Sequence, residues 1–283
     1  MNLSSIIAAR ARSCPTKAAI VFEGRTITYG QLAHRIQAGA MALKRSDVRR
    51  GDRVAVLSRN LPSMLEILFA CARIGAIFVP INWRLLRTDI KYVLDDCVPK
   101  VLASDSDHAE IVEPGWAPHL WCLEEGVGYP WVSYDNLLSE SFGQAQEPHP
   151  TSLQDPICIL YTAGTTGRSK GVLLSQSNVL WNAVNSRFLH GLTSKDHVLT
   201  VIPLFHTGGL NIQTIPALFT GATITLHSGF DSVSALTAID QEKPTLTVLV
   251  PSQMAIMLAV SYTHLRAHET EAELVCRLLL EKK

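Results

Sequence analysis

The sequence has no excess of charge of either sign. Its 283 residues include 25 Lys and Arg against 25 Asp and Glu, and charged residues make up only 18% of the chain. Because a neutral chain has no overall field to attract phosphate backbones or anionic lipid, binding to nucleic acid or to a membrane surface is a poor interpretation. The 47% of hydrophobic residues supply a large core, so we expect a compact protein of one or two domains.

The sequence also lacks paired cysteines. No Cys-x-x-Cys string occurs, which argues against a zinc knuckle and a dense disulfide framework. We expect no secretion signal, because arginines follow the short N-terminal apolar patch rather than precede it. Reduced thiols and the lack of a signal favour a cytoplasmic protein. The six cysteines are Cys14, Cys71, Cys97, Cys122, Cys158 and Cys276.

No uninterrupted apolar run is long enough to cross a bilayer, which takes about 20 residues. Residues 198–230 contain no Asp, Glu, Lys or Arg, but Pro203, Gly208, Gly209 and Asn211 interrupt this stretch. We therefore expect a buried core segment there and no transmembrane segment.

Short β-branched runs alternate with helical patterns along most of the chain. This alternation predicts an α/β fold in which helices flank mostly parallel sheets. Thr88 is the expected N-cap of one helix, and Pro62 and Gly75 are expected at the start and end of another. A second set of layers is predicted from residue 156, after surface connections that contain short strands such as 119–123. The predicted strands are 53–58, 76–81, 100–103, 157–162, 197–202, 222–226 and 245–250, and the predicted helices are 62–75, 88–97, 176–189, 210–220 and 232–241.

The most informative segment is the string LYTAGTTGRSKGVLLSQSN at residues 160–178, where an apolar strand leads into glycines and hydroxyls. Gly164, Gly167 and Gly171 allow positive φ and close approach of a ligand, and successive backbone N–H groups in such a turn hold anions. Lys170 adds a positive charge, so the segment predicts a polyphosphate site. It is not the P-loop of nucleoside triphosphatases, because Ser169 rather than glycine precedes the lysine.

The string YTAGTTGRSKGV at residues 161–172 resembles the signature loop of the adenylate-forming, or AMP-binding, enzymes, usually YTSGTTGxPKGV. The family includes acyl-CoA synthetases, firefly-type luciferases and the adenylation domains of peptide synthetases. Ala163 and Ser169 depart from the usual Ser and Pro, and they leave the framework of glycines and lysine intact. The resemblance implies that Thr166 also contacts a metal ion. The nucleotide-binding residues that it implies are Thr162, Ala163, Gly164, Thr165, Thr166, Gly167 and Lys170.

A second string, PLFHTGGLN at residues 203–211, resembles the later motif of this family in which an aromatic residue and a histidine lie beside the substrate carboxylate. The resemblance implies that His206 is catalytic. From the residues alone, Phe205 and His206 follow a predicted strand, at the edge where parallel sheets bind ligands. A structural histidine is the alternative. Residues 60–86 resemble the acyl-CoA synthetase branch more weakly, and a well-packed βαβ unit explains them equally.

The resemblance covers residues 1–260 and implies the large N-terminal domain of these enzymes. Residues 261–283 do not match, and they form either an amphipathic helix or foreign sequence. The resemblance implies a reaction that uses ATP, Mg²⁺ and coenzyme A. A carboxylic acid, for which a fatty acid is the expected substrate, is converted into an acyl-adenylate and then into a thioester. No YGxTE-like string and no late lysine domain are found, so we expect an N-terminal fragment that does not complete the reaction. An adenylation domain that loads an amino or aryl acid onto a carrier protein, and a non-catalytic nucleotide-binding module, remain alternatives.

Overall fold

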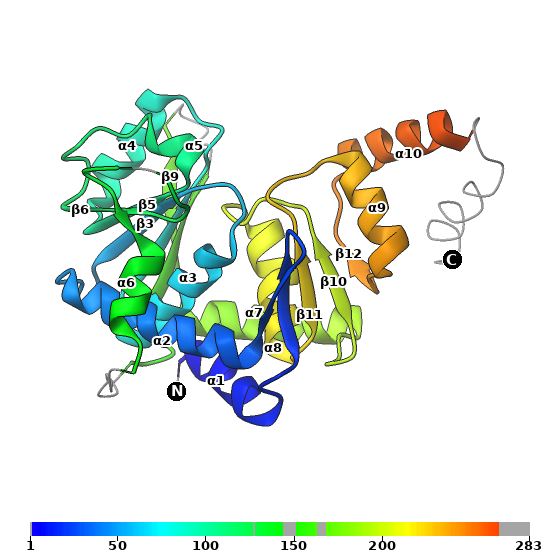
Figure 1. The fold of residues 1–283 in the computed structure, drawn as a ribbon, viewed down its shortest axis with the longest axis horizontal. Helices are drawn as coiled ribbons and strands as arrows, with labels where there is room; N and C mark the ends of the chain where they lie inside the picture. Colours follow the sequence, from blue (N-terminus) through cyan, green and yellow to red (C-terminus); the bar gives the residue numbers. More distant parts are fainter. Residues whose placement is uncertain (1, 127, 144–150, 163–167, 266–283) are drawn as a thin grey trace.

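The computed structural model describes residues 2–126, 128–143, 151–162 and 168–265, with side chains described to residue 260. This part of the chain forms two β-sheets with helices on their faces, so the predicted α/β fold is confirmed (Figure 1). One sheet has the strand order β7-β6-β5-β3-β4-β8-β9, and the other has the order β12-β10-β11-β1-β2.

The seven-stranded sheet is parallel except for its edge strand β9, which runs antiparallel to β8. The helix α3 ends at Gly75, which caps it with a φ of 79°, as the sequence predicts. The strands are β3 (Arg53–Leu57), β4 (Ile77–Ile81), β5 (Val101–Ser104), β6 (His119–Cys122), β7 (Val132–Ser133), β8 (Pro156–Thr162) and β9 (Lys170–Ser175), and the helices between them are α3 (Pro62–Ile74), α4 (Arg87–Cys97), α5 (Ser106–Ala109) and α6 (Tyr134–Ser141).

The five-stranded sheet combines the start of the chain with its later part. The strand β1 pairs in parallel with β11, and β2 closes one side as its antiparallel neighbour. The strands are β1 (Ala18–Phe22), β2 (Arg25–Thr28), β10 (His197–Thr200), β11 (Thr223–Leu226) and β12 (Leu246–Thr247), and the helices are α1 (Ser4–Ser13), α2 (Tyr29–Arg45), α7 (Gln176–His190), the π-helix η1 (Gly208–Thr214), α8 (Ile215–Thr220), α9 (Ser232–Glu242) and α10 (Pro251–Leu265).

Several predictions about elements are wrong in detail. Thr88 is not an N-cap, because the backbone is extended at Leu86 and the helix α4 has already begun at Arg87. The second set of layers does not begin at residue 156, since β8 pairs with β4 of the first sheet. The predicted strand 197–202 ends at Thr200. The helix expected over 210–220 divides into a π-helix and α8, and the strand expected over 245–250 has two residues.

Two helices were not predicted. Helices α5 and α6 lie within residues 104–150, where the sequence predicts surface connections with short strands.

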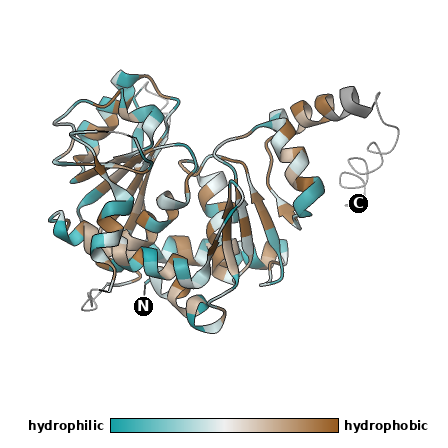
Figure 2. Ribbon diagram, in the orientation of Figure 1, coloured by the Kyte–Doolittle hydropathy of each residue, from teal (hydrophilic) through white to brown (hydrophobic). Residues whose placement is uncertain are grey.

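The packing of the sheets produces five layers. On β3, Val54 and Val56 belong to a cluster that fills the space between the sheets, whereas Ala55 and Leu57 belong to a second cluster with α4. The cluster between the sheets includes α1, α2, α3, α7 and α8. Leu199 on β10 faces a third cluster with α9 and α10. Figure 2 shows the corresponding apolar strands inside the molecule.

Two further observations bear on the predictions from the sequence. The five cysteines that the structure describes, up to Cys158, are all free thiols. Within the described ranges, no helix has the length and hydropathy required to span a bilayer.

The middle helical layer contains an ion pair whose carboxylate is buried. Arg35 on α2 lies 2.6 Å from the carboxylate of Glu66 on α3 and 2.7 Å from Asp135 on α6. Glu66 is completely buried, so its charge depends on this guanidinium. A buried charge without its partner is strongly unfavourable, whereas an apolar replacement of both partners is often tolerated.

We predict that Arg35→Met lowers the free energy of unfolding by about 3–5 kcal/mol, because it leaves the Glu66 carboxylate unpaired. The double variant Arg35→Met/Glu66→Leu should recover most of this loss. Arg45→Met is the control on the same helix, since the Arg45–Glu140 pair is solvent-exposed and should contribute about 1 kcal/mol or less. Urea-induced unfolding measures all three, and equal losses for Arg35→Met and Arg45→Met would contradict the prediction.

Candidate functional site

The carboxyl ends of parallel strands from both sheets converge on one region. In the seven-stranded sheet Phe78 of β4 pairs with Cys158 of β8. Asn82 and Thr162, each four residues further along the chain, therefore lie together where the strands end, at the carboxyl edge of the sheet. Ligands of open parallel sheets bind at this edge. The segment that follows Thr162 is the one predicted to hold phosphate.

Lys170 lies opposite Thr162 across the β8–β9 pair. The Thr162 hydroxyl lies 3.5 Å from the carbonyl oxygen of Lys170, and both residues are exposed. Lys170 is therefore the first residue of a strand, which the sequence did not predict, and not the end of a free loop. The structure thus places Thr162 and Lys170 together. The other predicted nucleotide-binding residues, Ala163, Gly164, Thr165, Thr166 and Gly167, lie outside the described residues.

Gly171 has a different role from the one expected. It lies within β9, and a Cβ atom there would be 2.7 Å from the Ile159 side chain and 3.3 Å from the Tyr161 ring. The glycine is required by side chains of β8 and not by positive φ.

His206 lies in the loop that follows β10 and is exposed. The backbone N–H of Gly208 donates to its Nδ1 at 3.0 Å. This hydrogen bond assigns the neutral ring to the tautomer with the proton on Nε2. His206 can therefore donate a hydrogen bond from Nε2 to a carboxylate or phosphate oxygen, and it is a donor rather than a base in this arrangement.

Gly209 allows the loop to fold back on itself. A Cβ atom at this position would be 2.4 Å from the Pro203 oxygen and 2.5 Å from the Ile202 oxygen, which are backbone atoms. Only glycine fits this approach without moving the loop. Gly209 is the second residue of the π-helix η1, which begins at Gly208.

Trp83 joins the seven-stranded sheet to the histidine loop. It follows β4, the strand next to β8, and its ring centroid lies 6.5 Å from that of Phe205, with the planes at 85°. The guanidinium groups of Arg59 and Arg84 lie 5.9 Å and 4.8 Å from the Trp83 ring. The edge of one sheet therefore contacts the histidine loop of the other. In the sequence, Trp83 is marked only by its place in the βαβ unit at residues 60–86, which resembles the acyl-CoA synthetase branch weakly.

Asp105 and His108 extend the same edge beyond Trp83. The ring of His108 lies 5.6 Å from that of Trp83, and its Nδ1 lies 2.5 Å from a carboxylate oxygen of Asp105. The other oxygen accepts from the backbone N–H of Arg59 at 2.8 Å. Burial raises the pKa of Asp105, but the hydrogen bonds from His108 and Arg59 outweigh it and hold the pKa below 3.8.

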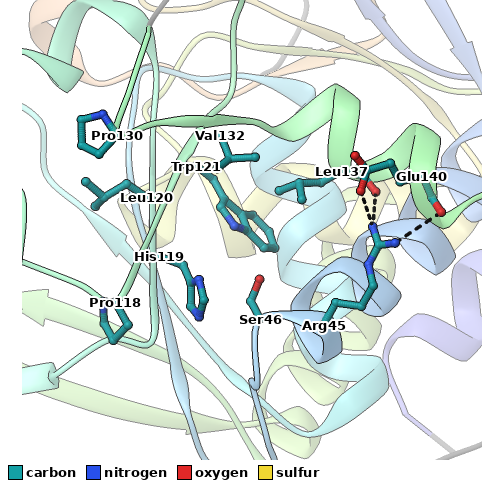
Figure 3. A pocket seen from close by; sticks show the side chains of 10 residues that line it. All are labelled: Arg45, Ser46, Pro118, His119, Leu120, Trp121, Pro130, Val132, Leu137 and Glu140. Carbon is teal, nitrogen blue, oxygen red and sulfur yellow. Dashed lines mark hydrogen bonds and ion pairs between the residues drawn. The ribbon is translucent and has the colours of Figure 1, made fainter.

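A separate pocket lies at the opposite edge of the seven-stranded sheet (Figure 3). Its volume is about 400 Å³, and it includes the amino end of β6 at His119. Arg45 lies 3.3 Å from Glu140 at its rim. This pocket therefore does not belong to the edge that carries Lys170 and His206. It is lined by Arg45, Ser46, Pro118, His119, Leu120, Trp121, Pro130, Val132, Leu137 and Glu140.

Over the described residues no three His, Cys, Asp or Glu side chains are arranged to hold an ion. Thr166, the predicted metal contact, lies outside them.

Comparison with known proteins relates most of this chain to one family. Residues 7–277 match the family model described as AMP-binding enzyme. An indoleacetate–CoA ligase of Aromatoleum aromaticum is 44% identical over 92% of this chain and 51% of its own length. A feruloyl-CoA synthase of Amycolatopsis is 37% identical over 88% of this chain and 49% of its own length. The chain spans about half the length of these relatives.

The fold is also shared with solved structures. A benzoate CoA ligase from Burkholderia xenovorans superposes with a TM-score of 0.83 at 20% identity, over 91% of this chain and 52% of that protein. The layered architecture described above is therefore that of the matched portion of such proteins.

We predict that Gly209→Ala lowers the free energy of unfolding by about 1–3 kcal/mol, because the added methyl group displaces the backbone at Ile202 and Pro203. Gly229→Ala is the control, since a Cβ atom at Gly229 meets nothing within 4 Å, and its effect should stay within about 0.5 kcal/mol. Urea-induced unfolding compares the two. Similar losses would show that the loop does not require Gly209.

Asp105 makes stability depend on pH. Because its folded-state pKa lies below the unfolded-state value, its contribution is present above the unfolded-state pKa and is lost as pH falls through the folded-state pKa. Asp105→Asn should therefore cost about 1–3 kcal/mol at neutral pH, and the difference from the parent chain should shrink below pH 3.8. Urea unfolding across this range measures the difference.

The control is Asp107→Asn, since Asp107 forms an exposed pair with Arg59 and should contribute about 1 kcal/mol or less. A difference between Asp105→Asn and the parent that stays constant with pH would contradict the prediction.

Proposed function

This chain belongs to the AMP-binding enzyme family, and from that membership we propose that it forms the nucleotide loop and part of the acid-binding edge of an AMP-forming acid–CoA ligase. The observation that supports the proposal most directly is the contact of Trp83 with Phe205. It joins the sheet that contains Thr162 and Lys170 to the loop of His206, and this contact supports a single region for the proposed phosphate-binding and carboxylate-binding groups.

The proposed reaction has two steps. An oxygen of the substrate carboxylate attacks the α-phosphorus of ATP, the bond to the bridging oxygen breaks, and pyrophosphate leaves with the electron pair. The thiolate of coenzyme A then attacks the acyl carbonyl carbon, and AMP leaves. The site must therefore hold the carboxylate in line with the phosphorus and keep water from the mixed anhydride.

In this proposal the residues at the edge stabilise charge at different places. The ammonium group of Lys170 and the hydroxyl of Thr162 would contact the β- and γ-phosphates, where negative charge grows as pyrophosphate leaves. His206 would donate a hydrogen bond from its Nε2–H group to the carboxylate or to an oxygen of the α-phosphate. His206 thus orients the nucleophile and takes no proton from it.

The described residues supply no cluster of metal ligands. We therefore propose Mg²⁺ as part of the MgATP substrate, with Thr166 as its protein contact, and assign it no step. Mg²⁺ would supply charge neutralisation on the phosphates.

For the acid, we propose an aromatic or arylalkyl carboxylate as the first candidate and a fatty acid as the second. The names of the indoleacetate and feruloyl relatives favour the aromatic class. The aromatic pair of Trp83 and Phe205 would suit a planar ring. The fatty-acid candidate comes from the sequence resemblance to acyl-CoA synthetases.

We predict that Lys170→Ala weakens MgATP binding by about 10-fold or more, because a charge-assisted hydrogen bond to phosphate is lost. Isothermal titration calorimetry on the whole chain measures the affinity. Lys100→Ala is the control, since Lys100 precedes β5 at the opposite edge of the sheet. If both variants bind MgATP like the parent, the nucleotide site is not at Lys170.

A further inference from the structure

Asn60 follows β3 of the seven-stranded sheet, yet its side chain bonds to the five-stranded sheet. Its Nδ2 donates to the carbonyl oxygen of Ile202 at 3.1 Å and to that of His227 at 3.0 Å. Its Oδ1 accepts from the backbone N–H of Leu204 at 2.7 Å. The residue is 2% exposed. One amide group therefore ties the loops after β10 and β11 to the end of β3.

The hydrogen-bonding capacity of this amide is used within the protein. Both N–H donors and the carbonyl oxygen have backbone partners, so Asn60 is not arranged to bind a ligand. The backbone reinforces the link, because the N–H of Asn60 donates to the Ser228 oxygen at 3.0 Å. On the other side, Asp105 holds the backbone N–H of Arg59. The short segment at residues 59–60 is thus held from both sheets.

The loop that Asn60 holds is the one that carries His206. Leu204, whose N–H is bonded to Asn60, lies two residues before the histidine. The N–H of His206 then donates to the Pro203 oxygen at 3.1 Å, and the His206 oxygen accepts from Leu210. Because these hydrogen bonds join residues only three or four positions apart, the position of Leu204 determines the position of the His206 imidazole. The Asn60 side chain is the distant hydrogen-bonding partner of Leu204 at the start of this turn, and Trp83 contacts the same turn through the Phe205 ring.

We propose that Asn60 is a positioning residue that holds the His206 loop in register with the edge at Thr162 and Lys170. What His206 does there rests on the proposed function, whereas the positioning itself rests on the hydrogen bonds above. An apolar side chain of similar shape would leave the Ile202 and His227 oxygens and the Leu204 N–H without hydrogen-bond partners. Because unpaired polar groups away from water are unfavourable, the loop should rearrange locally.

The test is Asn60→Leu in the whole chain, studied by native-state hydrogen exchange and by ¹⁵N spectra of the histidine rings. We expect the amides of Leu204, His206 and Leu210 to exchange about 10-fold faster or more, and amides in β5 to be unchanged. The His206 ring should lose the signature of a single Nε2–H tautomer. A general loss of stability would not change that ring in the folded protein.

Asn82→Leu is the matched control. Asn82 follows the neighbouring strand β4. Its side-chain oxygen accepts a hydrogen bond from the nearby backbone N–H of Arg84 at 3.0 Å, so this bond does not connect the two sheets. Asn82→Leu should leave the exchange of the His206 loop unchanged. If Asn60→Leu does not fold, Asn60→Ser decides, since serine is too short to reach both loops and should give the same local changes.

The two proposals can fail separately. Unchanged exchange and an unchanged His206 ring in a folded Asn60 variant would overturn the positioning role, whether or not the chain binds MgATP. If the local changes occur in the Asn60 variants but the parent chain binds no MgATP, the positioning role stands and the proposed function is overturned.

Discussion

The parallel pairing of strands is the constraint on which this molecule depends. Parallel strands end at the same edge, so the chain segments that follow β3, β4, β5 and β8 must lie side by side. The second sheet obeys the same rule, and the loops after β10 and β11 meet at its own carboxyl edge. A helical layer shared by both sheets places the two edges together. The candidate site is the product of this geometry more than of any single motif.

The sequence predicts best those elements whose residues are neighbours along the chain. The unit from β3 through α3 to β4 has strong periodicity, and Gly75 marks its turn. The pairing of β1 with β11 joins residues about 200 positions apart, so local sequence patterns do not predict it. The strand β9 was also missed, because the glycine and hydroxyl residues before it dominate the composition. The composition around Gly171 predicts positive φ and close approach of a ligand, whereas packing against β8 explains the glycine in the structure.

The candidate site divides in the same way. The motifs predict Thr162, Lys170 and His206 as site residues, and the described residues place Thr162 beside Lys170. Trp83, Asp105 and His108 were not found, since each is an ordinary residue in an ordinary βαβ unit until the fold brings them together. Asn60 is a similar case. Its three partners are backbone groups more than 140 residues away, and backbone groups have no sequence signature.

The edge strand β9 has a consequence for how this chain behaves in solution. It is the last strand of its sheet in the described part of the chain, and its Val172 and Leu173 side chains are 46% and 55% exposed. An open edge with apolar side chains is a template on which a strand of another molecule can add. Lys170 begins that strand, so intermolecular sheet extension would place a foreign backbone next to the lysine. Any pairing through this strand would therefore also limit the access of solutes to this corner.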